Sequence, residues 1–196
     1  MSEYNALRLI TEPTIEPISV TEAKAHLVVE HFSDDTLIGA LIVAARRHVE
    51  ARTGRALVRQ KWRLTRDCFA NRMDLFRLPA QAVDSVNYVD QDGANQVLDA
   101  TVYTFDYSGY VRLAYDQSWP STRDQSGAVW IDFWAGYFSP TSSPMDLDGD
   151  VPADIKAAIK LLVGHLYEHR EQHTDMQTYA TPTMDLLLAP YWVPSG

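Results

Sequence analysis

Cysteine is almost absent from this chain, because only one of its 196 residues, Cys68, carries a thiol. A single thiol excludes both an internal disulfide framework and a zinc knuckle. Long apolar runs are missing as well: the longest, residues 37–45, is far shorter than the roughly 20 residues that span a bilayer. Residues 1–14 lack the charged start and apolar core of a secretory signal. We therefore expect a protein made in the cytoplasm, with no membrane partner.

Positive charge is scarce too. Lys and Arg number 17 against 26 Asp and Glu, which gives a formal net charge of -9. This balance argues against a protein that grips nucleic acid over its whole surface, because neutralising phosphates requires clustered cations. The same charge balance is compatible with double-stranded DNA that passes the protein without binding tightly to it. The length and the 46% hydrophobic content fit a globular protein with one domain, or one domain with an insert.

The common catalytic signatures are also missing. The chain has no Gly-x-Ser-x-Gly elbow and no glycine-rich phosphate loop. His165, His169 and His173 lie four residues apart, so the first two suit one metal ion on a helix. No further ligand recurs at a recognisable spacing. We therefore predict that the chain is not an enzyme and needs no cofactor or metal, with a histidine-based metal-dependent enzyme as the alternative.

What the sequence does contain is helical periodicity at both ends. Pro13 and Pro17 indicate an extended N-terminal arm over residues 1–18. Ser19 and Glu22 have the spacing of a capping box and predict a helix over residues 19–30. Apolar residues at three- and four-residue spacing predict further helices over residues 34–53 and 151–172. The first two are joined by a short connection, which favours a helical hairpin.

Between these helices the pattern changes to period two. Residues 57–136 alternate apolar and polar side chains and carry turn signals, which predicts an antiparallel sheet or a small sandwich. The expected fold is α+β, with the N-terminal helical hairpin and the long C-terminal helix packed together and the antiparallel β insert between them. Residues 19–172 would form the domain, between the arm and a C-terminal docking tail over residues 173–196.

Basic residues are concentrated in one stretch of the chain. Eight of the 17 lie between Arg46 and Arg66, where Glu50 is the only acid. One interpretation is a solvated basic face. The other is a head-to-tail interface in which this segment meets the acidic surface of the next subunit. The candidates for that interface are Arg46, Arg47, Arg52, Arg55 and Arg59.

The C-terminal tail combines apolar and aromatic side chains. Aromatic residues bury a large area at low entropic cost, so an exposed tail of this kind favours docking to a partner. The alternative is a tail that folds back on its own domain. The candidate docking residues are Leu186, Leu187, Leu188, Pro190, Tyr191 and Trp192.

Several stretches together resemble the head-tail connector (adaptor) family of tailed bacteriophages and gene transfer agents. The similarity covers both ends of the chain and part of the middle. The matching stretches are residues 17–27 (PISVTEAKAHL), 34–57 (DDTLIGALIVAARRHVEARTGRAL), 62–64, 78–79, 86–93 (VNYVDQDG), 151–171 (VPADIKAAIKLLVGHLYEHRE) and 187–191 (LLAPY).

This resemblance implies a structural protein of the particle neck. Such connectors form a ring of about twelve identical subunits beneath the portal, continue the DNA channel and present a platform for the tail. The implied partners are other copies of the chain, the portal protein, and a stopper or tail-terminator protein. Double-stranded DNA would pass through the lumen without sequence-specific binding. A neck stopper or tail-terminator ring protein from the same kind of virion or phage-like particle is the alternative within this class.

Overall fold

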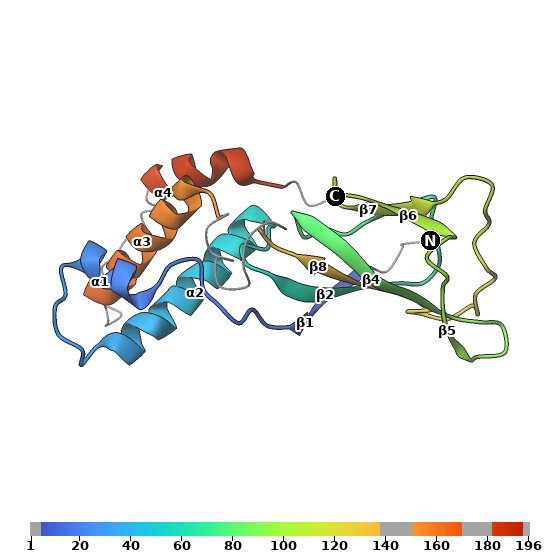
Figure 1. Cartoon of the computed structure of the whole chain (residues 1–196), viewed down its shortest axis with the longest axis horizontal. Coiled ribbons are helices and arrows are strands. Elements are labelled where there is room, and N and C mark those ends of the chain that lie inside the picture. The colour runs from blue at the N-terminus through green and yellow to red at the C-terminus, as the bar shows by residue number, and fades with distance from the viewer. Residues whose placement is uncertain (1–4, 138–150, 170–181, 194–196) are drawn as a thin grey trace. The chain divides into compact units, whose positions relative to one another are not determined.

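The computed structural model describes residues 5–137, 151–169 and 182–193. It divides the chain into two compact units (Figure 1). We call residues 1–13 and 59–136 the β unit, and residues 14–58 and 137–196 the helical unit. The division into an arm over residues 1–18, a domain over residues 19–172 and a docking tail over residues 173–196 stays a prediction.

The β unit contains a five-stranded sheet in the order β1-β2-β8-β4-β5, and every pair is antiparallel. Its strands are β1 (Asn5–Thr11), β2 (Gln60–Arg66), β8 (Val129–Ala135), β4 (Ala80–Val89) and β5 (Asn95–Val97). The predicted antiparallel sheet is therefore confirmed. Strand β1 lies within the predicted extended N-terminal arm and pairs with β2 over most of its length. Its prolines lie beyond its end and do not interrupt the ladder.

A second sheet in the β unit has three short strands in the order β3-β7-β6. They are β3 (Arg72–Asp74), β7 (Tyr110–Leu113) and β6 (Tyr103–Asp106). Both sheets contribute fully buried side chains to this unit: Leu64, Ile131 and Phe133 from the larger, Met73 and Val111 from the smaller. Because side chains alternate along a strand, the residues between these point to the other face of each sheet.

The helical unit is built from α1 (Val20–Leu27), α2 (Asp35–Thr53), α3 (Ala153–Glu168) and α4 (Pro182–Leu188), with a 3-10 turn over Ala189–Tyr191. Helices α1, α2 and α3 contact one another, and α4 contacts α3 (Figure 1). Their apolar faces meet in one cluster of buried residues that includes Ile42, Val49 and Ile159. No helix in the described part of the chain is both long and apolar enough to cross a bilayer.

The helix ends match the sequence signals in part. The capping box of α1 is present: the Ser19 hydroxyl accepts from the backbone N–H of Glu22, whose carboxylate accepts from the backbone N–H of Ser19. The carboxylate of Asp34, at the start of α2, makes no cap and accepts the Tyr167 hydroxyl at 2.5 Å instead. Helix α3 is shorter than the predicted 151–172, because His169 leaves the helical conformation (φ -107, ψ 64). Residues 170–172 lie outside the described residues.

Candidate assembly surfaces

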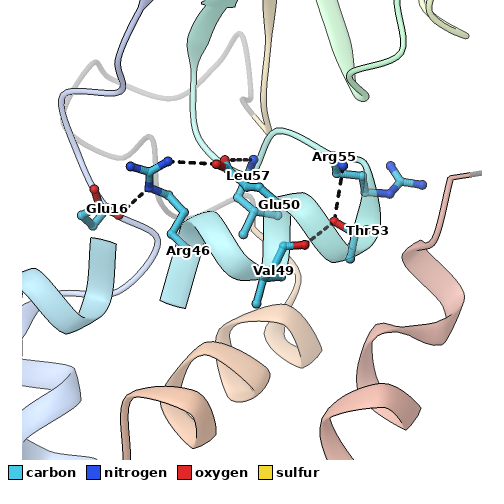
Figure 2. Close-up of polar contacts among 7 residues, drawn as sticks. All are labelled: Glu16, Arg46, Val49, Glu50, Thr53, Arg55 and Leu57. Atoms are coloured by element: carbon cyan, nitrogen blue, oxygen red, sulfur yellow. Dashed lines mark hydrogen bonds and ion pairs between the residues drawn. The ribbon is translucent and has the colours of Figure 1, made fainter. Parts of the chain in front are cut away.

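A buried ionic cluster joins three segments of the helical unit (Figure 2). Arg46 of α2 is only 2% exposed. Its Nε donates to a Glu16 carboxylate oxygen at 2.7 Å, and its Nη1 donates to Glu50 at 2.9 Å. The other Glu50 oxygen accepts the backbone N–H of Leu57 at 2.9 Å. The cluster therefore fixes both the segment before α1 and the turn after α2 onto α2.

This burial decides the role of Arg46. Burial by itself lowers the pKa of the guanidinium, but the Glu16 hydrogen bond and the Glu50 charge outweigh it and raise the pKa above its ordinary value. Arg46 is therefore charged and satisfied within its own subunit. Its place in the interior corrects the prediction that Arg46 is one of the cations of a subunit interface.

The other four arginines of that group differ in their surroundings and contacts. Arg47 is exposed on α2. Arg52 is also exposed, and its Nη2 lies 2.9 Å from the Asp185 carboxylate of α4. The Nε of Arg55 donates to the carbonyl oxygen of Tyr191 at 2.6 Å. Arg59 lies in the β unit, with its guanidinium carbon 4.4 Å from the centroid of the Trp134 ring. The basic stretch of sequence is thus divided between the two units.

Part of the C-terminal segment is folded back onto the helical unit. Leu188 is 2% exposed, and Leu187 and Tyr191 pack against the same core. The backbone N–H of Val193 donates to the carbonyl oxygen of Thr53 at 2.9 Å, just before the left-handed Gly54 that ends α2. These contacts hold the segment against the C-terminal end of α2 through both apolar packing and hydrogen bonds.

Other side chains of the same segment face solvent. Leu186 is 78% exposed, Trp192 is 62% exposed, and Pro190 is exposed as well. A groove of about 480 Å³ lies beside them, lined by Arg52, Thr53, Asp185, Leu188, Ala189 and Trp192. The six predicted docking residues therefore fall into two sets: three that pack inward and three that present an apolar surface next to a groove.

The β unit carries a basic and aromatic surface on one face of its larger sheet. Lys61 of β2 stands opposite Trp134 of β8, and Arg63 stands opposite Asp132. The Lys61 ammonium is 5.9 Å from the Trp134 ring centroid, and the Arg63 guanidinium carbon is 5.8 Å from that of Trp130. Cations at these distances are attracted to the face of an indole.

Arg63 also forms a bidentate ion pair on this face. Its Nε and Nη2 donate to the two Asp132 carboxylate oxygens at 2.7 and 2.8 Å. This bidentate hydrogen bonding, together with the Asp132 charge, raises the pKa of Arg63. This surface was not predicted from the sequence. The alternation of Lys61 and Arg63 was visible, but their partners lie some seventy residues further along the chain, which only the β2–β8 register reveals.

The histidines considered as metal ligands lie next to each other. The rings of His165 and His169 have centroids 4.6 Å apart, and His173 lies outside the described residues. Among the described residues, no group of three or more His, Cys, Asp or Glu side chains is placed to hold a metal ion. Cys68, the single thiol, is exposed.

The fold is similar to that of solved neck proteins. A chain from the neck of an empty gene transfer agent (GTA) particle, computed with C6 symmetry, superposes with a TM-score of 0.77 at 21% identity and covers 97% of both chains. A chain from the virion of a native GTA particle gives 0.75 at 21% identity, covering 97% of this chain and 96% of its own. A chain from the neck of a native GTA particle, computed with C12 symmetry, gives 0.73 at 22% identity, again over 97% of each.

No relative was found among curated proteins. A family model does match: residues 16–181, which include most of the helical unit and the β unit except residues 1–13, fit the model described as head completion protein. The chain therefore belongs to the head completion protein family.

Proposed function

We propose that this chain is a structural head-tail connector subunit in the neck of a phage or gene transfer agent particle. Copies of it form a ring under the portal, extend the DNA channel and provide the platform to which the tail attaches. The chain works by assembly and not by catalysis, and it needs no cofactor. It is made in the bacterial cytoplasm and acts in the virion or phage-like particle.

One observation carries this proposal: the chain belongs to the head completion family and shares its fold over nearly its whole length with chains of GTA particles. In two of these comparisons the similarity covers 97% of both chains. Two of those necks were computed with C6 and C12 symmetry, as expected for rings of repeated subunits. The formal charge of -9 suits a lumen through which DNA slides, provided that enough acids face inward.

The helical unit supplies the surface that we assign to the portal. Its helices contribute buried residues to a common core, and this core holds the inward side of the C-terminal segment. Leu186, Pro190 and Trp192 then face outward beside the groove. Apolar side chains held on a rigid base bind with little loss of conformational freedom. We therefore narrow the docking surface to these three residues.

Cryo-electron microscopy of the assembled particle tests the proposal directly. The chain should be found as a ring between the portal and the next neck component, with the C-terminal segment on the portal side. A ring located further down the neck would instead identify a stopper or tail-terminator protein. Purified chain that binds a stoichiometric metal and turns over a small molecule would contradict the structural role and support the histidine-based alternative.

A second experiment tests the docking surface alone. Changing Leu186 and Trp192 together to Ala should lower portal binding by about tenfold or more, since exposed aromatic and aliphatic anchors dominate such interfaces. The variant should stay folded because both side chains are exposed. Val28→Ala is the matched control, because Val28 is 84% exposed in the same unit but far from the segment in sequence. Equal portal binding by the double variant and the control would exclude this surface.

A further inference from the structure

The larger sheet of the β unit carries an outward face with an unusual composition, which we call the Trp face. On the inward face, Leu64, Ile131 and Phe133 are fully buried, so the core does not require the tryptophans on the other side. Arg8 of β1 lies directly opposite Arg63 and therefore on the same face. The residues of the Trp face are Arg8, Arg59, Lys61, Arg63, Trp130 and Trp134.

The charge on this face is predominantly positive. Asp132 pairs with Arg63, and Asp84 lies 2.7 Å from the Lys61 ammonium. Both tryptophans are only partly buried, and Arg8 and Arg59 are exposed. A half-exposed indole flanked by cations suits a partner that offers an aromatic ring next to a carboxylate.

The same β unit presents such an element elsewhere. Tyr115 is 99% exposed, the most exposed large apolar or aromatic side chain among the described residues. The next residue, Asp116, is also exposed and has a positive φ of 56°, so the chain turns sharply there. We call these two residues the Tyr115–Asp116 knuckle. It follows β7 of the smaller sheet, whereas the Trp face belongs to the larger one.

The sequence around the knuckle is strongly acidic. Residues 90–124 contain six aspartates and two arginines. Backbone N–H groups of Thr101 and Ser108 donate to Asp99 and Asp106 and lower the pKa of each carboxyl, so both stay charged near neutral pH. This part of the β unit is therefore complementary in charge to the Trp face.

We propose that the Tyr115–Asp116 knuckle of one copy docks on the Trp face of a second copy. The Tyr115 ring packs against the indoles, and the Asp116 carboxylate lies among the cations. Because the two surfaces differ, the contact is head-to-tail and can repeat around a ring. This inference rests on the proposed function and names the contact through which the ring is built.

Double-stranded DNA fits this face less well. Cations attract phosphate, but Asp84 and Asp132 stand among them, and a stacked duplex offers no free ring to a half-buried indole. A protein partner with an aromatic side chain beside an acid can contact the indoles and the cations of the Trp face at the same time. Every other copy of the chain carries such a partner, the Tyr115–Asp116 knuckle.

Self-association of the purified full chain, measured by sedimentation velocity over a concentration series, tests the contact. Tyr115→Ala should weaken association by about tenfold or more, as loss of an interface aromatic does. Asp116→Asn removes the charge and keeps a residue that tolerates positive φ, and it should weaken association less. Tyr107→Ala is the matched control, since Tyr107 is 78% exposed in the same unit and should leave association unchanged.

Charge exchange identifies the two surfaces as partners. Arg59→Glu and Asp116→Arg should each weaken association. The double variant should recover much of the loss, because a cation at position 116 of the knuckle then meets an acid at position 59 of the Trp face. Thermal melts confirm that each variant is folded. A photoreactive residue at position 115 should crosslink to residues 59–63 or 130–134 of another copy.

Several outcomes would overturn the inference. Crosslinks to other segments, no recovery in the double variant, or a wild-type chain that stays monomeric at every concentration would each do so. Duplex DNA retention that falls with Arg59→Glu while self-association does not would assign the face to DNA. If Tyr115→Ala chains still enter the neck ring of assembled particles, this contact is wrong while the proposed function stands.

Discussion

The two units use the same basic stretch of sequence in opposite ways. In the helical unit, Arg46 is buried between two glutamates and Arg52 holds the Asp185 carboxylate of the C-terminal segment. In the β unit, Arg59 and Lys61 lie over an indole at the surface. These two arginines of the helical unit therefore join segments of its fold, whereas Arg59 and Lys61 of the β unit form part of the Trp face. The number of arginines in a stretch of sequence does not distinguish these roles. Each role depends on which carboxylates and aromatic rings the fold places beside the arginine.

The largest expected effect comes from breaking the buried cluster. Glu50→Ala removes the acceptor of both Arg46 and the Leu57 N–H, and it leaves a buried cation with one partner fewer. We expect the free energy of unfolding to fall by about 3 kcal/mol, the order found when one member of a buried pair is removed. Chemical denaturation followed by circular dichroism at the helix band measures this loss.

This variant also tests whether the units unfold separately. Trp62, Trp119, Trp130 and Trp134 lie in the β unit, whereas Trp192 alone lies in the helical unit. Tryptophan fluorescence thus reports mainly on the β unit, and helical dichroism reports on the other. With Glu50→Ala, the helical transition should move to lower denaturant while the fluorescence transition moves less. Coincident shifts of equal size would show that the units unfold as one cooperative body.

The second prediction compares inward and outward residues of the C-terminal segment. Leu188 is 2% exposed in the helical core, so Leu188→Ala should cost about 2–3 kcal/mol of stability. Leu186→Ala is the matched control two residues earlier: its side chain is 78% exposed, and the change should stay within about 0.5 kcal/mol. Equal losses from the two variants would contradict the division of this segment into an anchored side and a docking side.

The third prediction concerns the ion pair of the β unit. Arg63→Ala leaves Asp132, which is 7% exposed, without its bidentate partner. The Arg63 side chain is itself 39% exposed, so solvent screens part of the interaction and we expect a loss of about 1–2 kcal/mol. Lys61→Ala, which removes a more exposed pair with Asp84, should cost less than about 1 kcal/mol. Fluorescence-detected denaturation distinguishes the two.

Local signals in the sequence predicted much of the fold. The Ser19 and Glu22 capping box and the apolar stripe of α2 both act within one or two turns of helix. The antiparallel β region was predicted for the same reason, because period-two alternation is a local property. The resemblance to head-tail connectors, carried by these helical blocks, agrees with the family match and with the fold of the GTA neck chains.

Features that depend on distant partners were not predicted. Strand β1 is recognised only when it pairs with β2, some fifty residues away. The burial of Arg46 depends on Glu16, thirty residues before it. The Trp face depends on the β2–β8 register. In each case the feature is stabilised by a tertiary contact. The helical or strand periodicity of the sequence does not indicate such contacts.

The smallest predicted effect concerns acid sensitivity of the helical unit. The backbone N–H of Ser19 donates to the Glu22 carboxylate and lowers its pKa below the ordinary 4.5, with Lys160 adding to the shift. A lowered pKa in the folded state stabilises the fold above pH 4.5, and this contribution is lost as the pH falls through the folded-state pKa. Ionised Glu22 near the start of α1 should contribute about 0.5 kcal/mol.

Glu22→Gln isolates that contribution, because the amide oxygen can still accept from the Ser19 N–H but carries no charge. At neutral pH the variant should be slightly less stable than the wild type, and the difference should vanish in acid once Glu22 is protonated. Helical dichroism should record this convergence. Tryptophan fluorescence should not record this convergence, because it reports mainly on the β unit. The acid response of that unit depends on its own carboxyls at Asp90, Asp99 and Asp106, all with lowered pKa. A gap between wild type and variant that persists below the Glu22 pKa would show that the carboxylate acts through its shape and not through its charge.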